Sequence, residues 1–238
     1  MKQVWSPRLI VNTQDIIYNI KTIKNYIGDN VDIMPIIKDD AYGTEINNRI
    51  DIFEKANIKI LGVAIVDEGI KLREAGYKGD IFVLNQPLKN EIPAIYEYNL
   101  IAGIGSIDFL NDIGDFGKNI KIHIEIGTGM GRTGIRPTKI NEYIKTAQKY
   151  KNIIIDGIYT HFSCSDCDKE YTKKQIESFN FALDIAKKEV PTLRYIHCCN
   201  SAGIIDFPEA HFNLVRPRFN FIWLLPSRLF KRENNFKT

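Results

Sequence analysis

Long apolar runs are missing from this sequence. The longest late run, residues 219–225, contains Asn220 and is far too short to span a bilayer. The first residues, MKQVWSPRLIVN, lack the apolar segment that a signal peptide requires. We therefore expect a cytoplasmic protein that has no membrane partner.

Cysteine is also scarce, with four residues in a chain of 238. A chain of this length can bury roughly 70% of the surface that its unfolded form exposes, so it can fold without disulfides or a structural metal. Cytosolic thiols are normally kept reduced. We expect all four cysteines to be free thiols.

A strong net charge of either sign is absent. Lysine and arginine number 32 and aspartate and glutamate 29, which leaves a formal net charge of +3. The charges are scattered, and we find no base-reading motif and no array of stacking aromatic residues, so we expect no nucleic-acid partner. No linker rich in proline, glycine or serine divides the chain, which favours one domain.

What the sequence does contain is a regular alternation of apolar strands and helix-like segments. Such strands are typical of parallel β/α units in which helices cover the sheet. Eight of them predict an α/β fold of the closed (β/α)8 TIM-barrel type. The expected strands are 31–37, 59–66, 80–84, 99–104, 120–126, 153–160, 194–198 and 211–216, and the expected helices are 44–56, 67–76, 88–97, 106–115, 138–150, 170–189 and 201–206.

The first thirty residues stand outside this repeat. Residues 9–11 predict a short lead-in strand, and Asn12 or Thr13 is expected to cap the helix after it. One face of that helix is marked by Ile16, Ile17, Ile20, Ile23 and Ile27. We therefore expect a lead-in strand and helix over 1–30, a barrel over 31–217 and a C-terminal tail over 218–238.

Polar residues follow several of the predicted strands. In a parallel barrel the carboxyl ends of the strands meet at one mouth, where catalytic groups gather. This rule, applied to the sequence alone, predicts a pocket formed by Lys38, Arg132, His161, Asn200, Ser201 and Arg216.

Lys38 directly follows an apolar strand. We expect its amine to be desolvated there, which disfavours the ammonium form and favours a nucleophile of the Schiff-base kind. The alternative is a lysine whose charged end simply reaches solvent from the strand terminus. Tyr42, four residues later, can offer its hydroxyl to an anion, and Gly43 allows a tight turn.

Two further segments have both a functional and a structural interpretation. Residues 201–203 could open a helix whose free N–H groups bind an anion, or Ser201 could only cap that helix. The glycine-rich segment 127–131 could approach a ligand closely or be a flexible loop. It lacks the Lys-Ser or Lys-Thr pair of the nucleotide-hydrolase phosphate loop.

Histidine and cysteine provide a competing metal hypothesis. His161, Cys164 and Cys167 have the spacing H-x2-C-x2-C, and Cys198 and Cys199 end the next strand. Two such strand ends could bind zinc. Because adjacent residues of a strand point to opposite sides, Cys198 and Cys199 are poorly placed to share an ion. A His161 ring that stacks on a planar ligand explains this histidine at least as simply as zinc binding does. We therefore predict no metal site.

Taken together and in this order, these segments resemble the alanine racemase family, enzymes that depend on pyridoxal phosphate (PLP) and have an N-terminal barrel. The resemblance covers residues from about 8 to 217. Its motifs are IIKDDAYG (36–43), VAIVDEGIKLREAG (63–76), GTGMGRTGI (127–135), GIYTHFS (157–163), HCCNSAG (197–203) and LVRP (214–217), together with the pair Gln175 and Phe179.

The resemblance implies PLP as the cofactor. Lys38 would carry it covalently and act as one proton-transfer base. Tyr42 and Ser201 would hold the cofactor phosphate, and Asn200 would support the neighbourhood of that phosphate.

The resemblance also implies the surroundings of the pyridine ring. His161 would stack on the ring, and Arg216 would face its nitrogen and keep it unprotonated, which suits racemisation. Arg132 would bond the ring oxygen and, together with Met130, contact the substrate.

The sequence departs from the family pattern at several positions. Glu125 stands where the family commonly has a lysine that is modified to carry negative charge, and a native glutamate could supply that charge by pairing with Arg132. The family's residues are also replaced at Thr44, Glu45, Arg218, Ile222 and Trp223. Arg218 could itself bond the phosphate.

The resemblance implies that L-alanine and D-alanine are interconverted, with a small amino acid as substrate and a homodimer as a possible assembly. The family continues into a β-rich C-terminal domain that supplies a second base, whereas this sequence ends at Thr238, so we expect reduced activity. Two alternatives stay open: a non-catalytic protein of PLP binding or homeostasis, and a degenerate racemase fragment.

Overall fold

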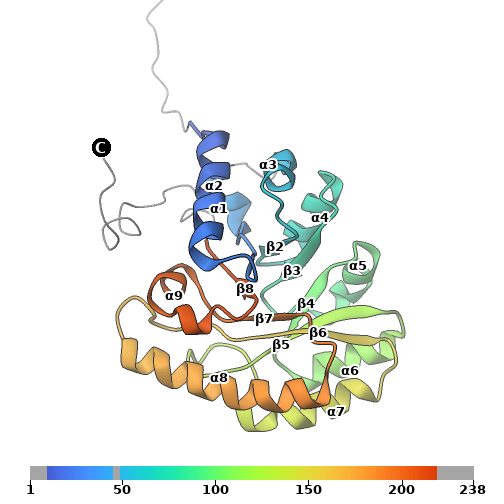
Figure 1. Ribbon diagram of the computed structural model, residues 1–238. Helices are drawn as coiled ribbons and strands as arrows, with labels where there is room; N and C mark the ends of the chain where they lie inside the picture. The colour runs from blue at the N-terminus through green and yellow to red at the C-terminus, as the bar shows by residue number, and fades with distance from the viewer. Residues whose placement is uncertain (1–9, 45–48, 219–238) are drawn as a thin grey trace, which may run out of the picture.

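The computed structural model of the protein describes residues 10–44 and 49–218 (Figure 1). The predicted lead-in strand over 9–11 is wrong for residues 10 and 11, which belong to no strand. The predictions made for Leu9, Glu45, Ile222 and Trp223, and for the tail from residue 219 onward, lie outside the described residues.

All eight predicted strands are present among the described residues, each within the range expected and shorter than it. They are β1 (Asp32–Ile33), β2 (Ile60–Val63), β3 (Asp80–Val83), β4 (Ile101–Ile104), β5 (Ile120–Glu125), β6 (Ile153–Tyr159), β7 (Tyr195–His197) and β8 (Leu214–Val215). Every strand pairing in the described part of the chain is parallel. The prediction of a parallel α/β fold is confirmed.

The strands form two sheets instead of one closed ladder. β2 to β7 make a six-stranded sheet in chain order, and β1 pairs with β8. Between β7 and β8 the Asn213 side chain takes the place of a backbone ladder: its Oδ1 accepts from Ile196 N at 2.8 Å, and its Nδ2 donates to Arg194 O at 2.8 Å. On the other side, Ile36 forms single bridges to Gly62 and to Arg218. The structure thus shows a curled parallel sheet instead of the predicted closed barrel. Its strand ladder is interrupted between β7 and β8 and between β1 and β2.

The helices alternate with the strands and cover the outer side of the curled sheet (Figure 1). None of those in the described residues is long and apolar enough to cross a membrane. The predicted helices are confirmed. The one predicted over 44–56 is seen only over its second half, as α3. They are α1 (Thr13–Ile27), α3 (Ile50–Lys55), α4 (Val66–Glu74), α5 (Ile92–Glu97), α6 (Ile107–Phe116), α7 (Ile140–Gln148), α8 (Lys169–Glu189) and α9 (Ser201–Asp206).

Helix α1 begins where the sequence indicates. The side chain of Asn12 accepts a hydrogen bond from Gln14 N at 3.0 Å, as an N-cap residue does. The predicted apolar face is buried at Ile16, Ile20, Ile23 and Ile27 and packs on the core. This packing attaches α1 to the strands.

Both faces of the curled sheet are buried. One apolar cluster joins the helices to the outer side of the strands. A second is made only by residues on or beside the strands: Met34, Ile36, Ile60, Phe82, Ile101, Tyr159, Tyr195 and Leu214. A sheet whose two faces are both covered explains why its strands are apolar throughout instead of alternating.

A substitution at Leu110 of α6 tests how much the packing between helices and strands contributes to stability. Its side chain is 0% exposed, so we expect Leu110→Ala to lower the free energy of unfolding by about 2–5 kcal/mol. Leu88→Ala is the matched control, because Leu88 is 66% exposed and its truncation should change stability by less than about 0.5 kcal/mol. Denaturant unfolding of both variants measures the difference, and equal losses would contradict this packing.

Candidate active site

The carboxyl ends of the strands surround a cavity of about 110 Å³ that opens to solvent. Its walls include Lys38, Tyr42, Arg132, His161, Asn200 and Arg216, six of the residues that the sequence predicts. An adjoining cavity shares His161, Asn200 and Arg218 with it and adds Ser201 and Met130. The structure therefore brings all of the predicted site residues together at one end of the sheet.

Lys38 begins a turn of unusual backbone conformation, α2 (Lys38–Gly43). The four residues 39–42 all have φ between 50° and 60° and ψ between 40° and 49°, which is a left-handed helical turn. L-amino acids adopt this conformation at a cost of roughly 1–2 kcal/mol per residue. Glu68 of α4 helps to hold the turn, since its Oε1 accepts from Asp39 N at 2.6 Å.

The expectation of a desolvated Lys38 is wrong for this structure. Its side chain is 41% exposed, and its Nζ lies 3.6 Å from Asp39 Oδ2. The turn begins five residues after β1 ends at Ile33, and the lysine that opens it lies in the wall of the solvent-open cavity.

Tyr42 presents a polar atom that has no partner. Its hydroxyl oxygen is buried and makes no hydrogen bond to any of the residues that the structure describes. Burial raises the pKa of Tyr42, so the hydroxyl stays protonated and able to donate. An unsatisfied buried hydroxyl facing a cavity is what an anion-binding tyrosine presents before its ligand.

Arg216 follows β8 and is 2% exposed. Its guanidinium donates to Thr160 O at 2.7 Å and to Cys198 O at 3.2 Å, both backbone oxygens, and to the rings of His197 and His161. Burial lowers the pKa of Arg216, but a guanidinium keeps its proton in proteins. The cavity thus has a fixed cation at its base.

His161 lies at the end of β6 and touches both cavities. Its Nδ1 lies 3.2 Å from an Arg216 guanidinium nitrogen, which can only donate, so Nδ1 accepts. Burial and, next, the charges of Arg216, Arg132 and Arg218 lower the pKa of His161 to about 3. The ring is therefore neutral and meets the cation through Nδ1.

Asn200 and Ser201 start α9. Asn200 Oδ1 accepts from Gly203 N at 2.9 Å and from Ser165 Oγ at 2.7 Å, so Asn200 is the cap of the helix. Ser201 does not cap it; its Oγ accepts from Arg218 N at 3.0 Å. Within residues 10–44 and 49–218, the Ser201 hydroxyl proton has no acceptor.

The glycine-rich segment closes as a loop on β5. Gly127 N donates to Ile135 O at 2.7 Å and Ile135 N donates to Glu125 O at 2.8 Å. Gly134, with φ of 95°, permits this closure, because a Cβ there would lie 2.7 Å from Gly127 N. The loop exposes Arg132 at the cavity.

Glu125 does not pair with Arg132 as we expected. No ion pair or hydrogen bond joins the two side chains in the part of the chain that the structure describes. Glu125 is buried, and its Oε2 lies 3.2 Å from the hydroxyl of Tyr159. Burial raises the pKa of Tyr159, which keeps that hydroxyl a donor. The loop closure carries Arg132 outward and leaves the glutamate inside.

Two further features of the site are a cavity residue without a signal in the sequence, Asn85, and a buried residue marked only by the family resemblance, Gln175. Asn85, just beyond β3, lines the main cavity. Gln175 of α8 is fully buried and joins two loops: its Oε1 accepts from Ser163 N at 3.0 Å, and its Nε2 donates to Thr128 Oγ1 at 3.0 Å. Its place in the family resemblance is the signal that marks Gln175.

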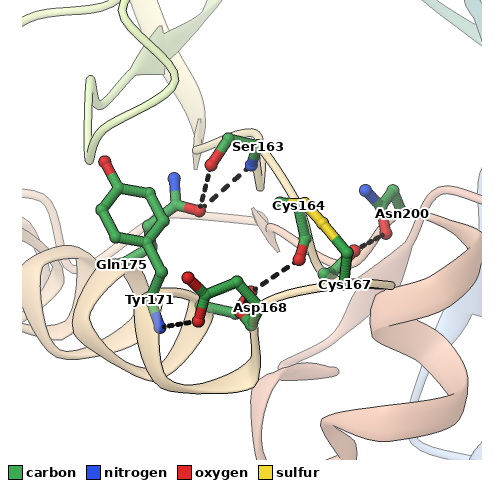
Figure 2. The surroundings of a disulfide bond; sticks show 9 residues. Ser163, Cys164, Cys167, Asp168, Tyr171, Gln175 and Asn200 are labelled. Carbon is green, nitrogen blue, oxygen red and sulfur yellow. Dashed lines mark hydrogen bonds between the residues drawn. A yellow bond between two sulfur atoms is a disulfide. The ribbon is translucent and has the colours of Figure 1, made fainter.

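The expectation of four free thiols is wrong for one pair. Cys164 and Cys167 form a disulfide in the loop before α8, while Cys198 and Cys199 are free and buried. Figure 2 shows that this loop lies between Gln175 and Asn200. A turn explains the pairing, since Cys167 N donates to Cys164 O at 3.2 Å and the two Cα atoms lie 5.4 Å apart.

The zinc hypothesis gains little from this geometry. Cys164, Asp166 and Cys167 have ligand atoms within 4.8 Å of one another, but His161 is engaged by Arg216. Two thiols bound to each other as a disulfide are not the thiolates that a zinc ion needs.

The sequence profile of the alanine racemase N-terminal domain matches residues 11–217. This chain belongs to that family.

Individual relatives agree with this assignment. The chain is 35% identical to an alanine racemase of Halothermothrix orenii over 216 residues, covering 89% of this chain and 57% of the relative. It is 34% identical to one of Carboxydothermus hydrogenoformans, covering 98% and 63%. The alanine racemase of Clostridium difficile 630 in complex with cycloserine matches with a TM-score of 0.82 and 28% identity, covering 87% of this chain and 58% of that one. The chain thus spans about six tenths of the length of these relatives.

His161 should make the protein less stable in mild acid. Its folded pKa of about 3 lies below the ordinary value of 6.5, so between these two values the unfolded state binds more protons. Stability is therefore lost as the pH falls below about 6.5. We expect the drop in unfolding free energy from pH 7 to pH 5 to be about 2 kcal/mol smaller in His161→Phe than in the unmodified chain. Equal drops in denaturant unfolding would contradict a neutral His161.

The disulfide is tested by mass spectrometry. Without reductant, Cys164 and Cys167 should resist alkylation in the native protein and the peptide joining them should be lighter by two hydrogens. With reductant both should be labelled, whereas Cys198 and Cys199, at 0% exposure, should react only after unfolding. Cys167→Ser is the control that frees Cys164 without reductant. Labelling of Cys164 in the unreduced native chain would contradict the pairing.

Proposed function

We propose that this chain binds PLP at the strand-end cavity and takes part in the interconversion of L-alanine and D-alanine. The observation that carries the proposal is the wall of that cavity. Its described residues include four cationic side chains, Lys38, Arg132, Arg216 and Arg218, and no carboxylate. A pocket of this kind suits an anionic ligand, and one of the cations is an amine able to form a covalent bond.

The residues present fit PLP on three independent observations. The buried, unpartnered hydroxyl of Tyr42 and the free hydroxyl proton of Ser201 are donors for a phosphate. The neutral His161 ring offers a flat face beside them. Arg216 supplies a buried donor for a ring nitrogen.

PLP, when bound, supplies an electron-withdrawing ring that stabilises negative charge on the α-carbon of an amino acid. Lys38 would hold the cofactor through its Nζ and move a proton at the same atom. Arg216 would donate to the ring nitrogen and, because a guanidinium does not release its proton, leave that nitrogen unprotonated. Arg132 and Met130, at the rim of the two cavities, would orient the substrate.

We also propose that the eight strands act as one closed barrel over residues 31–217, preceded by the lead-in over 1–30 and followed by the tail over 218–238. The two bridges of Ile36 and the bond from Arg216 N to Cys199 O, at 2.9 Å, support closure. A cytoplasmic location and a homodimer are proposed on the family resemblance alone.

Lys38 is tested by cofactor binding. We expect the protein to form a yellow complex with PLP that borohydride fixes on the peptide containing Lys38, and to form D-alanine from L-alanine. Lys38→Ala should lose the fixed label and the D-alanine while keeping its thermal melting profile.

Lys55→Ala is the matched control, because Lys55 lies on α3 with a side chain 65% exposed and pairs only with Asp51 among the salt bridges of the described residues. It should behave like the unmodified protein. Labelling of another lysine, or unchanged PLP affinity in Lys38→Ala, would overturn the proposed function.

A further inference from the structure

A buried line of polar groups runs from the mouth of the sheet into its interior, within the apolar cluster of strand residues. His197 of β7 and His123 of β5 are both 0% exposed. His197 Nδ1 lies 2.8 Å from an Arg216 guanidinium nitrogen, and His197 Nε2 lies 3.0 Å from His123 Nδ1. On the far side, His123 Nε2 lies 3.7 Å from Asp156 Oδ2. The proposed function uses Arg216 but none of the three residues behind it.

The direction of each hydrogen bond in this line follows from Arg216. A guanidinium only donates, so His197 Nδ1 accepts, and a neutral imidazole then carries its one proton on Nε2. That proton points at His123 Nδ1, which must accept, so His123 carries its proton on Nε2. This Nε2 faces the Asp156 carboxylate at 3.7 Å, beyond hydrogen-bond distance, and has no hydrogen-bond partner among the described residues. Burial lowers the pKa of both His197 and His123, which keeps each ring neutral. Only one arrangement of protons satisfies the line.

The backbone around His123 is shaped for this contact. The pairing of β5 with β6 shifts by one residue at His123, so that Asp156 is the extra residue between the pairs Ile122–Ile155 and His123–Gly157. Such a bulge re-aims the side chain that it carries. Gly157 leaves room for the ring, because a Cβ there would lie 2.5 Å from His123 Cδ2.

Aromatic neighbours fix the planes of both rings. Phe82 stacks on His123 with ring centroids 4.5 Å apart, and Tyr159 stacks on His197 at 5.0 Å with an interplanar angle of 5°. Neither imidazole can rotate without disturbing a buried ring. The hydrogen-bonding atoms are therefore held in line.

The Asp156 end is anchored by charge. Arg194 donates to both carboxylate oxygens of Asp156, at 3.1 and 2.8 Å, and also to Asp80 Oδ2 at 2.7 Å. Burial alone would raise the pKa of Asp156, but the neighbouring His123 and the bonded Arg194 outweigh it and lower that pKa to about 2. Asp80, Arg194 and Tyr195 are the other charged or titratable groups near His123.

We propose that His123 is a positioning residue for Arg216, acting through His197, with Asp156 as the fixed end of the line. An acceptor at His123 Nδ1 keeps the His197 proton on Nε2 and its Nδ1 open to Arg216. Arg216 then keeps the orientation in which its other nitrogen donates to His161 at the cavity. This proposal rests on the proposed function for its consequence, because Arg216 is the residue expected to meet the ring nitrogen of PLP.

Two substitutions separate positioning from packing. His123→Phe nearly preserves the ring volume and the stack on Phe82 but removes the acceptor. His123→Asn leaves a void but retains an oxygen near the place of Nδ1. If His123 only fills space, Phe should be the milder change. If it positions Arg216, Asn should be the milder change for every readout at the cavity.

The first readout is nitrogen NMR of the full chain with 15N-labelled histidine and without PLP. We expect His123, His161 and His197 to stay neutral from pH 8 to pH 5 with the proton on Nε2, and a scalar coupling across the bond between His197 Nε2 and His123 Nδ1. In His123→Phe the Nδ1 signal of His161 should move toward that of an imidazole without a donor, and in His123→Asn it should stay. A His197 proton on Nδ1, or an unmoved His161 signal in His123→Phe, would overturn the proposal.

The second readout is PLP affinity from absorbance titration. We expect about a tenfold loss for His123→Phe, the size of one hydrogen bond to a charged group, and less than about threefold for His123→Asn. The reverse order would overturn positioning. If the unmodified chain binds no PLP, the proposed function fails, while the nitrogen spectra still decide whether His123 holds Arg216.

Discussion

One buried guanidinium determines much of this structure. Arg216 is almost fully enclosed, and all four of its hydrogen-bond partners in the described residues are neutral: two backbone carbonyls and two imidazoles. A buried cation without a bonded carboxylate is costly unless its surroundings are ordered to receive it. The ends of β6, β7 and β8 therefore meet around this side chain, and both histidines that accept from it must be neutral. The result is an electropositive pocket whose positive charge is not cancelled from within.

The second constraint is conformational. The chain leaves β1 through a left-handed turn that places Lys38 at the cavity mouth and Tyr42 inside it. Strained backbone of this kind persists only where neighbouring structure holds it, and it gathers at functional sites. In this turn Glu68 accepts from Asp39 N while its other oxygen accepts from Ala64 N at 2.7 Å, so α4 and the turn are fixed together. The packing of the strands and helices around the turn offsets the conformational cost of its left-handed residues.

Much of this arrangement is predictable from the sequence. The eight strands and most helices follow from the spacing of apolar residues, and the site residues follow from the rule that parallel strands end at one mouth. The family resemblance adds roles that spacing alone does not give. The N-cap at Asn12 and the burial pattern of α1 also match the sequence pattern closely.

What the sequence does not predict depends on contacts between distant segments. The exposure of Lys38 accompanies a left-handed backbone turn that the sequence does not predict. Three of the four left-handed residues of this turn are aspartate or alanine and none is glycine, the residue that usually marks such a conformation. The contact of Glu125 with Tyr159 instead of Arg132 follows from loop closure through Gly134. The interrupted ladder beside β8 arises because the Asn213 side chain occupies the place of backbone pairs. The alignment of His123 with His197 requires a bulge in β6 that the alternation of apolar residues does not show.

The most direct test of the central claim is a crystal structure of this chain grown with PLP. The account predicts electron density that joins Lys38 Nζ to the cofactor, with the phosphate against Tyr42 and Ser201 and the ring nitrogen at hydrogen-bond distance from Arg216. Density at another place on the surface, or a ring nitrogen that faces a carboxylate, would contradict the proposed role of the buried guanidinium.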